Sequence, residues 1–167
     1  MIRYLLSGVL LLLVGCAAQA PLPVSAPDLP LPLQLHVQRN LAGASEDSLL
    51  VIQQEGQALR WSQLDPIGMP LARQRLVAQK WQADGFLPPN PAARELFAAL
   101  LFALTPGRDL PALYPDAQFT DQSRTLGTRW AVRYRQPPDR QPLVFTLDLG
   151  QGLRYQISPL PSEPSSQ

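Results

Sequence analysis

The chain has 167 residues, a length that suits one domain with room for a hydrophobic core. Its 14 basic side chains nearly balance its 13 acidic ones, which leaves no concentrated positive charge and argues against a nucleic-acid partner. It contains a single cysteine, so no disulfide can form within the chain and packing must stabilise the fold.

The N-terminal segment has the layout of a cleaved export signal. Arg3 precedes an apolar stretch over residues 5–14, which is too short to span a bilayer as a mature helix. The following Leu13-Val14-Gly15-Cys16 resembles the bacterial lipobox, in which the cysteine is acylated, for example with palmitate, and becomes the first mature residue. We therefore expect a signal peptide over residues 1–15 and lipidation of Cys16. The alternative is an accidental thiol in an ordinary signal peptide.

The residue after Cys16 indicates the destination of the protein. Ala17 stands where an aspartate would be the usual signal for retention in the inner membrane. By this resemblance we expect sorting to the outer membrane, with the domain facing the periplasm. Each buried CH2 group contributes about 0.8 kcal/mol, so several acyl chains on one residue give a stable membrane anchor.

The 19 prolines are unevenly distributed and mark the ends of the folded part. They cluster between residues 21 and 32 and again between 159 and 164, in stretches without aromatic residues that are typical of extended segments. We predict a lipidated tether over residues 16–32, a folded domain over 33–159 and a disordered tail over 160–167. A Pro-rich docking motif is the alternative for the tether.

The first half of the folded part alternates apolar and polar residues with period two, as in Leu33, Leu35 and Val37. This pattern predicts antiparallel strands that bury one face each. Further strands are expected at residues 49–52, at 59–61 and within 71–81, with turns at Glu55-Gly56 and at Asp65-Pro66-Ile67-Gly68.

The same alternation returns near the C-terminus. One strand is predicted over residues 126–134, followed by strands over 143–147 and 153–157. The apolar face of the strand over residues 126–134 would carry Leu126, Thr128, Trp130, Val132 and Tyr134. Its other face would carry Arg129, Arg133 and Arg135, which form either a solvated surface or a docking surface for an acidic partner.

A helix is predicted between these two groups of strands, over residues 91–104. Asn90 is a suitable cap, Pro91 fits the first turn, and Thr105-Pro106-Gly107 ends the helix. Its apolar residues extend around nearly the whole helix, so it must be covered on nearly all sides. A second short helix is expected at 109–114. The predicted fold class is α+β, an incomplete antiparallel β-barrel with the helices inside as a lid. An ordinary helix on an open α+β sheet is the alternative.

Three segments together resemble a known family. They are the lipobox with its Pro-rich segment, the turn Leu64-Asp65-Pro66-Ile67-Gly68, and residues 97–115. The family consists of uncharacterised bacterial outer-membrane lipoproteins from gene clusters for aryl-polyene pigments, which resemble the outer-membrane lipoprotein receptor of the Lol pathway (LolB-like). This resemblance implies a LolA/LolB-like fold, a curved sheet with a helical lid over a hydrophobic cavity.

The resemblance also implies a role for the turn. In the receptor, the matching turn carries an exposed leucine that touches the membrane, and its position corresponds to Ile67 here, with Met69 close by. The chain departs from the receptor at the first position of the motif, where Asp65 replaces asparagine. The alternative is that Ile67 folds back under the sheet.

The sequence offers little support for catalysis. His36 is the only histidine, and it falls on the polar side of a strand. A histidine base with a nucleophile, or a set of zinc ligands, would need more than this. The carboxylates Asp116, Asp121 and Asp148 are separated in sequence, and nothing pairs two of them. We therefore expect no enzyme, no catalytic residues, no metal site and no cofactor.

Aromatic and helical residues give a better indication of function. They would either form a plain core or line a cavity that holds an acyl or polyene chain. The candidate cavity-lining residues are Trp61, Trp81, Leu96, Phe97, Leu100, Leu101, Leu104, Trp130, Tyr134, Phe145 and Tyr155.

The expected function is binding or transfer of a lipid-like ligand by an outer-membrane lipoprotein. By the resemblance, the ligand is an acyl or aryl-polyene lipid or a lipoprotein acyl group, and a periplasmic lipoprotein carrier is a possible partner. The alternative is a structural adaptor that binds a periplasmic protein on its polar face.

Overall fold

The structure, a computed structural model, describes residues 19–88, 90–138 and 143–160. The predicted signal peptide, Cys16 and almost all of the predicted tail lie outside the described residues. Within them, no helix combines the length and apolarity needed to cross a membrane.

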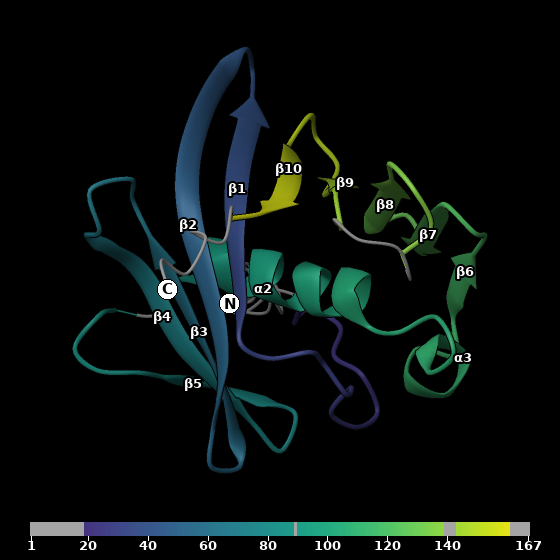
Figure 1. Ribbon diagram of the computed structural model, residues 1–167, viewed down its shortest axis with the longest axis horizontal. Helices are drawn as coiled ribbons and strands as arrows, with labels where there is room; N and C mark the ends of the chain where they lie inside the picture. Colours follow the sequence, from purple (N-terminus) through teal and green to yellow (C-terminus); the bar gives the residue numbers. More distant parts are fainter. Residues whose placement is uncertain (1–18, 89, 139–142, 161–167) are drawn as a thin grey trace, which may run out of the picture.

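Within the described residues, ten strands form one open antiparallel sheet (Figure 1). Their order across the sheet is β5-β4-β3-β2-β1-β10-β9-β8-β7-β6. The first five are β1 (Leu33–Leu41), β2 (Ala44–Glu55), β3 (Ala58–Leu64), β4 (Pro70–Val77) and β5 (Lys80–Ala83). The others are β6 (Ala117–Phe119), β7 (Ser123–Leu126), β8 (Trp130–Tyr134), β9 (Phe145–Asp148) and β10 (Arg154–Pro159). Together with the two helices of the described part of the chain, this sheet confirms the predicted α+β class.

The first and last strands join the two halves of the sheet. β1 pairs with β10 in antiparallel register, with Val37 opposite Ile157. Both side chains are fully buried, as is Leu50 on the other neighbour of β1. The predicted period-two alternation is therefore confirmed at the centre of the sheet, where buried residues of three strands meet on one face.

One predicted strand is divided in the structure. Residues 126–134 do not form a single strand, because the chain turns between β7 and β8. Gly127 adopts a φ of +54°, which glycine tolerates, and the amide of Arg129 donates to the carbonyl of Leu126. Thr128 consequently lies exposed in the turn and not on an apolar strand face. The short strand β6 was not predicted.

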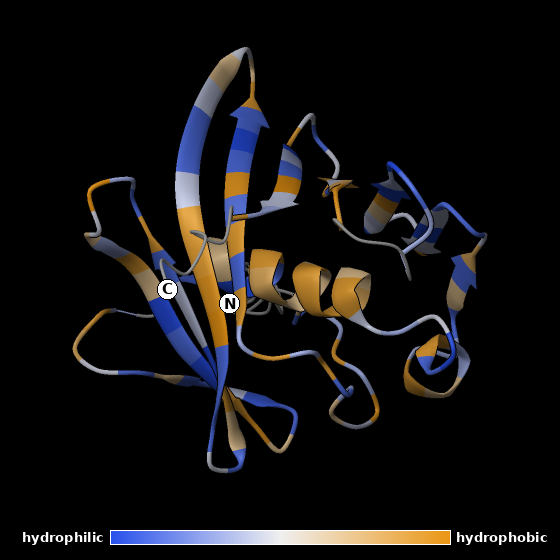
Figure 2. Cartoon of the chain, viewed as in Figure 1, coloured by the Kyte–Doolittle hydropathy of each residue, from blue (hydrophilic) through white to orange (hydrophobic). Residues whose placement is uncertain are grey.

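Helix α2 (Pro91–Leu104) has the predicted bounds. The side chain of Asn90 accepts a hydrogen bond from the amide of Ala93 at 3.0 Å, and Pro91 occupies the first turn. All residues from 96 to 104 are buried, so the helix is covered on all sides and does not rest on the sheet by one face alone. Figures 1 and 2 show this apolar helix lying within the curve of the sheet.

The described part of the segment expected to be a tether, residues 19–32, packs against the domain instead. Leu29 belongs to the hydrophobic core, and Leu22 and Leu31 pack against it. The amide of Val24 donates to the carbonyl of Leu113 in α3 (Leu110–Leu113), at 3.0 Å. Figure 1 shows this segment beneath α2, on the side away from β8, β9 and β10. The leucines between the prolines explain the difference, because they cover the part of the apolar helix that the sheet leaves open.

An ion pair ties α2 to the turn between β7 and β8. Glu95 accepts two hydrogen bonds from Arg129, at 2.8 and 2.7 Å, and one from the indole N–H of Trp130 at 2.7 Å. The hydrogen bond from Arg129 holds the pKa of Glu95 below its usual value of 4.5, against the opposing effect of burial. Arg129 is therefore engaged within the domain and does not share the polar strand face that was predicted for all three arginines, whereas Arg133 and Arg135 are exposed.

We predict that Glu95→Gln lowers the free energy of unfolding at pH 7 by about 2 kcal/mol, because charge-assisted hydrogen bonds to Arg129 and Trp130 are weakened. Urea unfolding measures this loss. The low pKa of Glu95 in the folded state stabilises the fold above the ordinary pKa of 4.5, and this contribution is lost as the pH falls through the folded-state pKa. The variant should therefore lose less stability than the parent over that acidic range.

Glu46→Gln is the matched control. Glu46 pairs with Arg39 at 3.0 Å, but the side chain of Glu46 is 68% exposed whereas that of Glu95 is 27% exposed, so the expected loss is below about 0.5 kcal/mol. Equal losses for the two variants would show that the Glu95 pair contributes no more than a surface ion pair.

Candidate functional site

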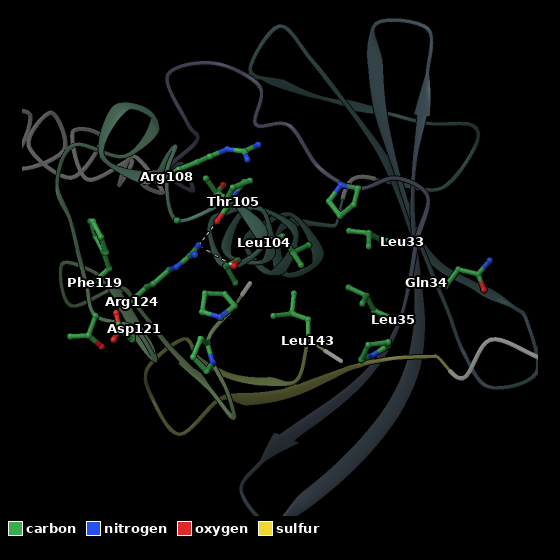
Figure 3. Close-up of a pocket in the computed structure, with 18 residues that line it drawn as sticks. Leu33, Gln34, Leu35, Leu104, Thr105, Arg108, Phe119, Asp121, Arg124 and Leu143 are labelled. Atoms are coloured by element: carbon green, nitrogen blue, oxygen red, sulfur yellow. Dashed lines mark hydrogen bonds between the residues drawn. The ribbon is translucent and has the colours of Figure 1, made fainter. Parts of the chain in front are cut away.

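The structure contains a cavity of about 850 Å³ beyond the last turn of α2 (Figure 3). It is bordered by the start of β1, the end of α2, the segment after the helix, and the end of β6. Its apolar wall includes Leu33, Leu35, Leu104, Phe119 and Leu143, together with several prolines, and its charged residues are Arg108, Asp121 and Arg124. This volume lies within the range of small-molecule binding sites.

The end of α2 creates this space. Pro106 cannot donate a backbone hydrogen bond and disfavours a helical conformation at Thr105, whose ψ is +129°. The amide and the hydroxyl of Thr105 both donate to the carbonyl of Leu101. The helix therefore ends at Leu104, and its last two residues line the cavity together with residues 105–108, which follow it.

Arg124 caps the C-terminus of α2. It projects from β7, is only 2% exposed, and donates from Nη1 to the carbonyls of Phe102, Ala103 and Thr105. These carbonyls lack partners within the helix, and their partial negative charge favours a cation at this end. Burial lowers the pKa of Arg124, but the guanidinium stays charged at neutral pH because its usual pKa is so high.

Tyr134 supports the same cap from β8. Its hydroxyl donates to the carbonyl of Ala103 at 2.6 Å, and its ring lies 5.2 Å from the guanidinium carbon of Arg124. Burial raises the pKa of Tyr134 above its usual value of 10, so the phenol is neutral. Tyr134 therefore contributes a hydrogen bond and a ring face to the cap, but no negative charge for Arg124.

Leu104 is the one predicted cavity-lining residue that lies on the wall of this cavity. The others do not line it: Trp81 is partly buried and packs against the core, and the rest are buried within it. These other residues are Trp61, Trp81, Leu96, Phe97, Leu100, Leu101, Trp130, Tyr134, Phe145 and Tyr155.

Ring contacts explain this placement. Trp61 stacks on Phe97 with ring centroids 5.4 Å apart, and Trp81 meets the edge of Trp61 at 5.9 Å. Tyr134 and Phe145 have centroids 5.5 Å apart. Because α2 fills the curve of the sheet along its length, its side chains and the aromatic residues occupy the space that a ligand would need.

The predicted membrane-contact tip is exposed. Ile67 is 85% exposed and Met69 is 60% exposed, so Ile67 does not fold back under the sheet. The carboxylate of Asp65 accepts hydrogen bonds from the amides of both residues, at 3.0 and 2.8 Å. The side chain of Asp65 thus makes the hydrogen bonds to turn amides that an asparagine side chain could also make. These bonds fix a turn in which both apolar side chains are exposed.

Phe86 is an exposed aromatic residue that was not predicted as part of the tip. It is fully exposed, and it follows β5, which runs back toward the hairpin of β3 and β4. Leu71 at the start of β4 is also about half exposed. These residues therefore lie at the same end of the sheet as Ile67 and Met69. The sequence could have indicated this exposed position, because the apolar residues Phe86 and Leu87 directly follow an Asp84-Gly85 turn.

The remaining candidate polar residues have ordinary environments. His36 contacts Asp47 at 2.8 Å on the polar side of β1, as expected for a surface histidine. Asp148 accepts a hydrogen bond from the amide of Gly150, and Asp121 lies at the cavity. Within the described ranges, no group of three or more His, Cys, Asp or Glu side chains is arranged to hold a metal ion.

We predict that Arg124→Met lowers the free energy of unfolding by about 3 kcal/mol, because three carbonyls at the end of α2 lose a charged donor. Urea unfolding measures the change. Arg133→Met, on the exposed face of β8, is the matched control and should cost below about 0.5 kcal/mol. A small effect at position 124 would mean that the cap does not stabilise the helix.

No protein-family model and no curated protein matches this chain. The resemblance to the aryl-polyene lipoproteins stays a prediction.

Proposed function

We propose that the chain is a non-enzymatic outer-membrane lipoprotein that binds or transfers a lipid-like ligand, held in the cavity at the C-terminal end of α2. The cavity is the observation that carries this proposal. Its volume of about 850 Å³ and its wall of leucine, phenylalanine and proline side chains suit an acyl or polyene chain. In this proposal the ligand binds beyond the helix, not along it as the sequence pattern suggested.

The exposed tip supports a membrane-associated function. Large apolar side chains at the end of a hairpin are unfavourable in water unless they meet an apolar partner. Ile67, Met69 and Phe86 lie at one end of the sheet and would enter the lipid surface to which acylated Cys16 anchors the chain. The open antiparallel sheet around α2 agrees with the LolB-like architecture that the resemblance implies.

The first test concerns the cavity. The full chain, extracted from bacterial membranes in a nonionic detergent, should carry bound lipid that mass spectrometry detects. Leu33→Trp adds bulk at the cavity wall and should reduce the bound lipid about tenfold, which corresponds to a steric cost of about 1.4 kcal/mol. Leu153→Trp is the matched control, because Leu153 is half-buried outside the cavity. Absence of lipid from the parent chain, or equal loss in both variants, would contradict the proposal.

A second test concerns the tip. Because Cys16 is the single cysteine, its acylation leaves a newly introduced cysteine as the one reactive thiol. We expect an environment-sensitive fluorophore on Ile67→Cys or Phe86→Cys, in liposome-anchored full chain, to shift its emission to the blue and to be quenched by nitroxide lipids. Val24→Cys is the control, because Val24 is exposed beside α3 at the other end of α2. An unshifted signal at position 67 would contradict membrane contact.

A further inference from the structure

We infer that the ligand of this cavity is an amphiphile with one apolar chain and an anionic head group, a carboxylate or a phosphate monoester, and that the head group binds Arg124. This inference rests on the proposed function, because it names the class of ligand for the same cavity. It goes further by assigning the charge of the head group and the residue that recognises it.

The first step is the unusual state of Arg124. A buried arginine is normally paired with a carboxylate, because removing a lone charge from water is costly. Arg124 is 2% exposed, yet no carboxylate of the described chain forms an ion pair with it. Its partners are backbone carbonyls and the ring of Tyr134.

The second step is the unused hydrogen-bonding capacity of the guanidinium. All three hydrogen bonds to the end of α2 come from Nη1. Neither Nε nor Nη2 donates to any residue in the described ranges. Nη2 lies beside Gly107, 3.8 Å from the position that a Cβ atom of that residue would occupy, and both residues line the cavity. An arginine presents Nε and Nη2 as a pair of donors that fits a carboxylate or phosphate.

The third step is the balance of charge. The C-terminus of a helix carries about half a negative charge, which offsets about half of the charge on Arg124. Tyr134 is neutral, so about half a positive charge is left beside an apolar wall. Figure 3 shows the side chain of Arg124 extending across the cavity toward Thr105, between Phe119 and Leu104. An anionic head group would supply the missing negative charge while its chain covered the leucines.

Other charged residues lie toward the solvent side of the cavity. Arg108 is largely exposed and lies 3.9 Å from Asp28 and 3.6 Å from Asp109, so its charge is already partly balanced. Asp121 is exposed and would be solvated. Since exposed charges are screened by water and salt, the buried Arg124 dominates recognition of a head group within the cavity.

The test compares head groups on the unmodified full chain in nonionic detergent micelles. The probes are palmitic acid, the corresponding alkyl phosphate, the methyl ester and the alcohol, each with a diazirine at the chain end. After photo-crosslinking, mass spectrometry quantifies labelled peptides that contain cavity residues, with Leu33→Trp as the background. We expect the two anionic probes to label these peptides about tenfold more than the two neutral ones, as a charge-assisted hydrogen bond in a buried site implies.

Two variants assign the preference to a residue. Arg124→Gln should abolish the difference between anionic and neutral probes, whereas Arg108→Gln should change it less than about twofold, because Arg108 is exposed. If Arg124→Gln fails to fold, the comparison of head groups on the unmodified chain decides the question, since it requires no variant.

The outcomes separate the inference from the proposed function. Equal labelling of the cavity by all four probes would overturn the inference and leave lipid binding in place. An absence of cavity labelling by every probe would overturn both. A preference for anions that persists in folded Arg124→Gln, or that disappears in Arg108→Gln, would overturn the assignment to Arg124. A preference for only the carboxylate or only the phosphate would support the inference and identify the head group.

Discussion

The structure depends on the need to enclose a helix that is apolar on all sides. Residues 96–104 present leucine, phenylalanine and alanine in every direction, so no face of the helix can be left in water without a large loss of hydrophobic free energy. A flat sheet covers one face of a helix. Here the sheet curves around α2, and the segment before β1 covers what the sheet leaves open through Leu22, Leu29 and Leu31. Leu29 is therefore part of the core, and the described residues around it pack against the domain.

Hydrogen bonds from the β7–β8 hairpin hold α2 in place at two positions along the helix, Glu95 and Ala103. At the turn between β7 and β8, Arg129 and Trp130 bind Glu95, and at the other end of the hairpin Tyr134 binds the carbonyl of Ala103. From residue 95 to 103 the helix rises by about 12 Å, and from residue 130 to 134 an extended strand spans about 13 Å. The two lengths agree, so β8 can contact α2 at both positions without distortion of the strand or the helix. The hairpin thereby fixes the position of α2 along its axis, which burial alone cannot do.

Local patterns predicted most of the fold. The alternation at Leu33, Leu35 and Val37, the turn at residues 65–68 and the bounds of α2 all depend on neighbouring residues, which the sequence displays directly. The cavity and its arginine could not be predicted in this way, because their formation depends on where a helix ends relative to strands far along the chain. The sequence did contain one indication of the arginine site. Arg124 and Leu126 lie two residues apart on β7, so their side chains point to the same, inward face of the strand, where a charged residue is unexpected. The aromatic residues were assigned to a cavity wall because apolar strand positions do not reveal whether a helix or a ligand fills the space beside them.

The location of the cavity constrains how a lipid carrier of this shape would work. Phe86 and the hairpin tip lie toward the N-terminal end of α2, whereas the cavity lies beyond its C-terminal end. A helix of 14 residues is about 21 Å long, so the two features are separated by roughly the length of the helix. If the proposed tip contacts a bilayer, the cavity lies about the length of α2 away from it. In the proposed function, a ligand would then enter from a soluble carrier while the tip stays at the membrane. Its delivery to the bilayer would require either a path along α2 or a rotation of the whole domain on the proposed lipid anchor.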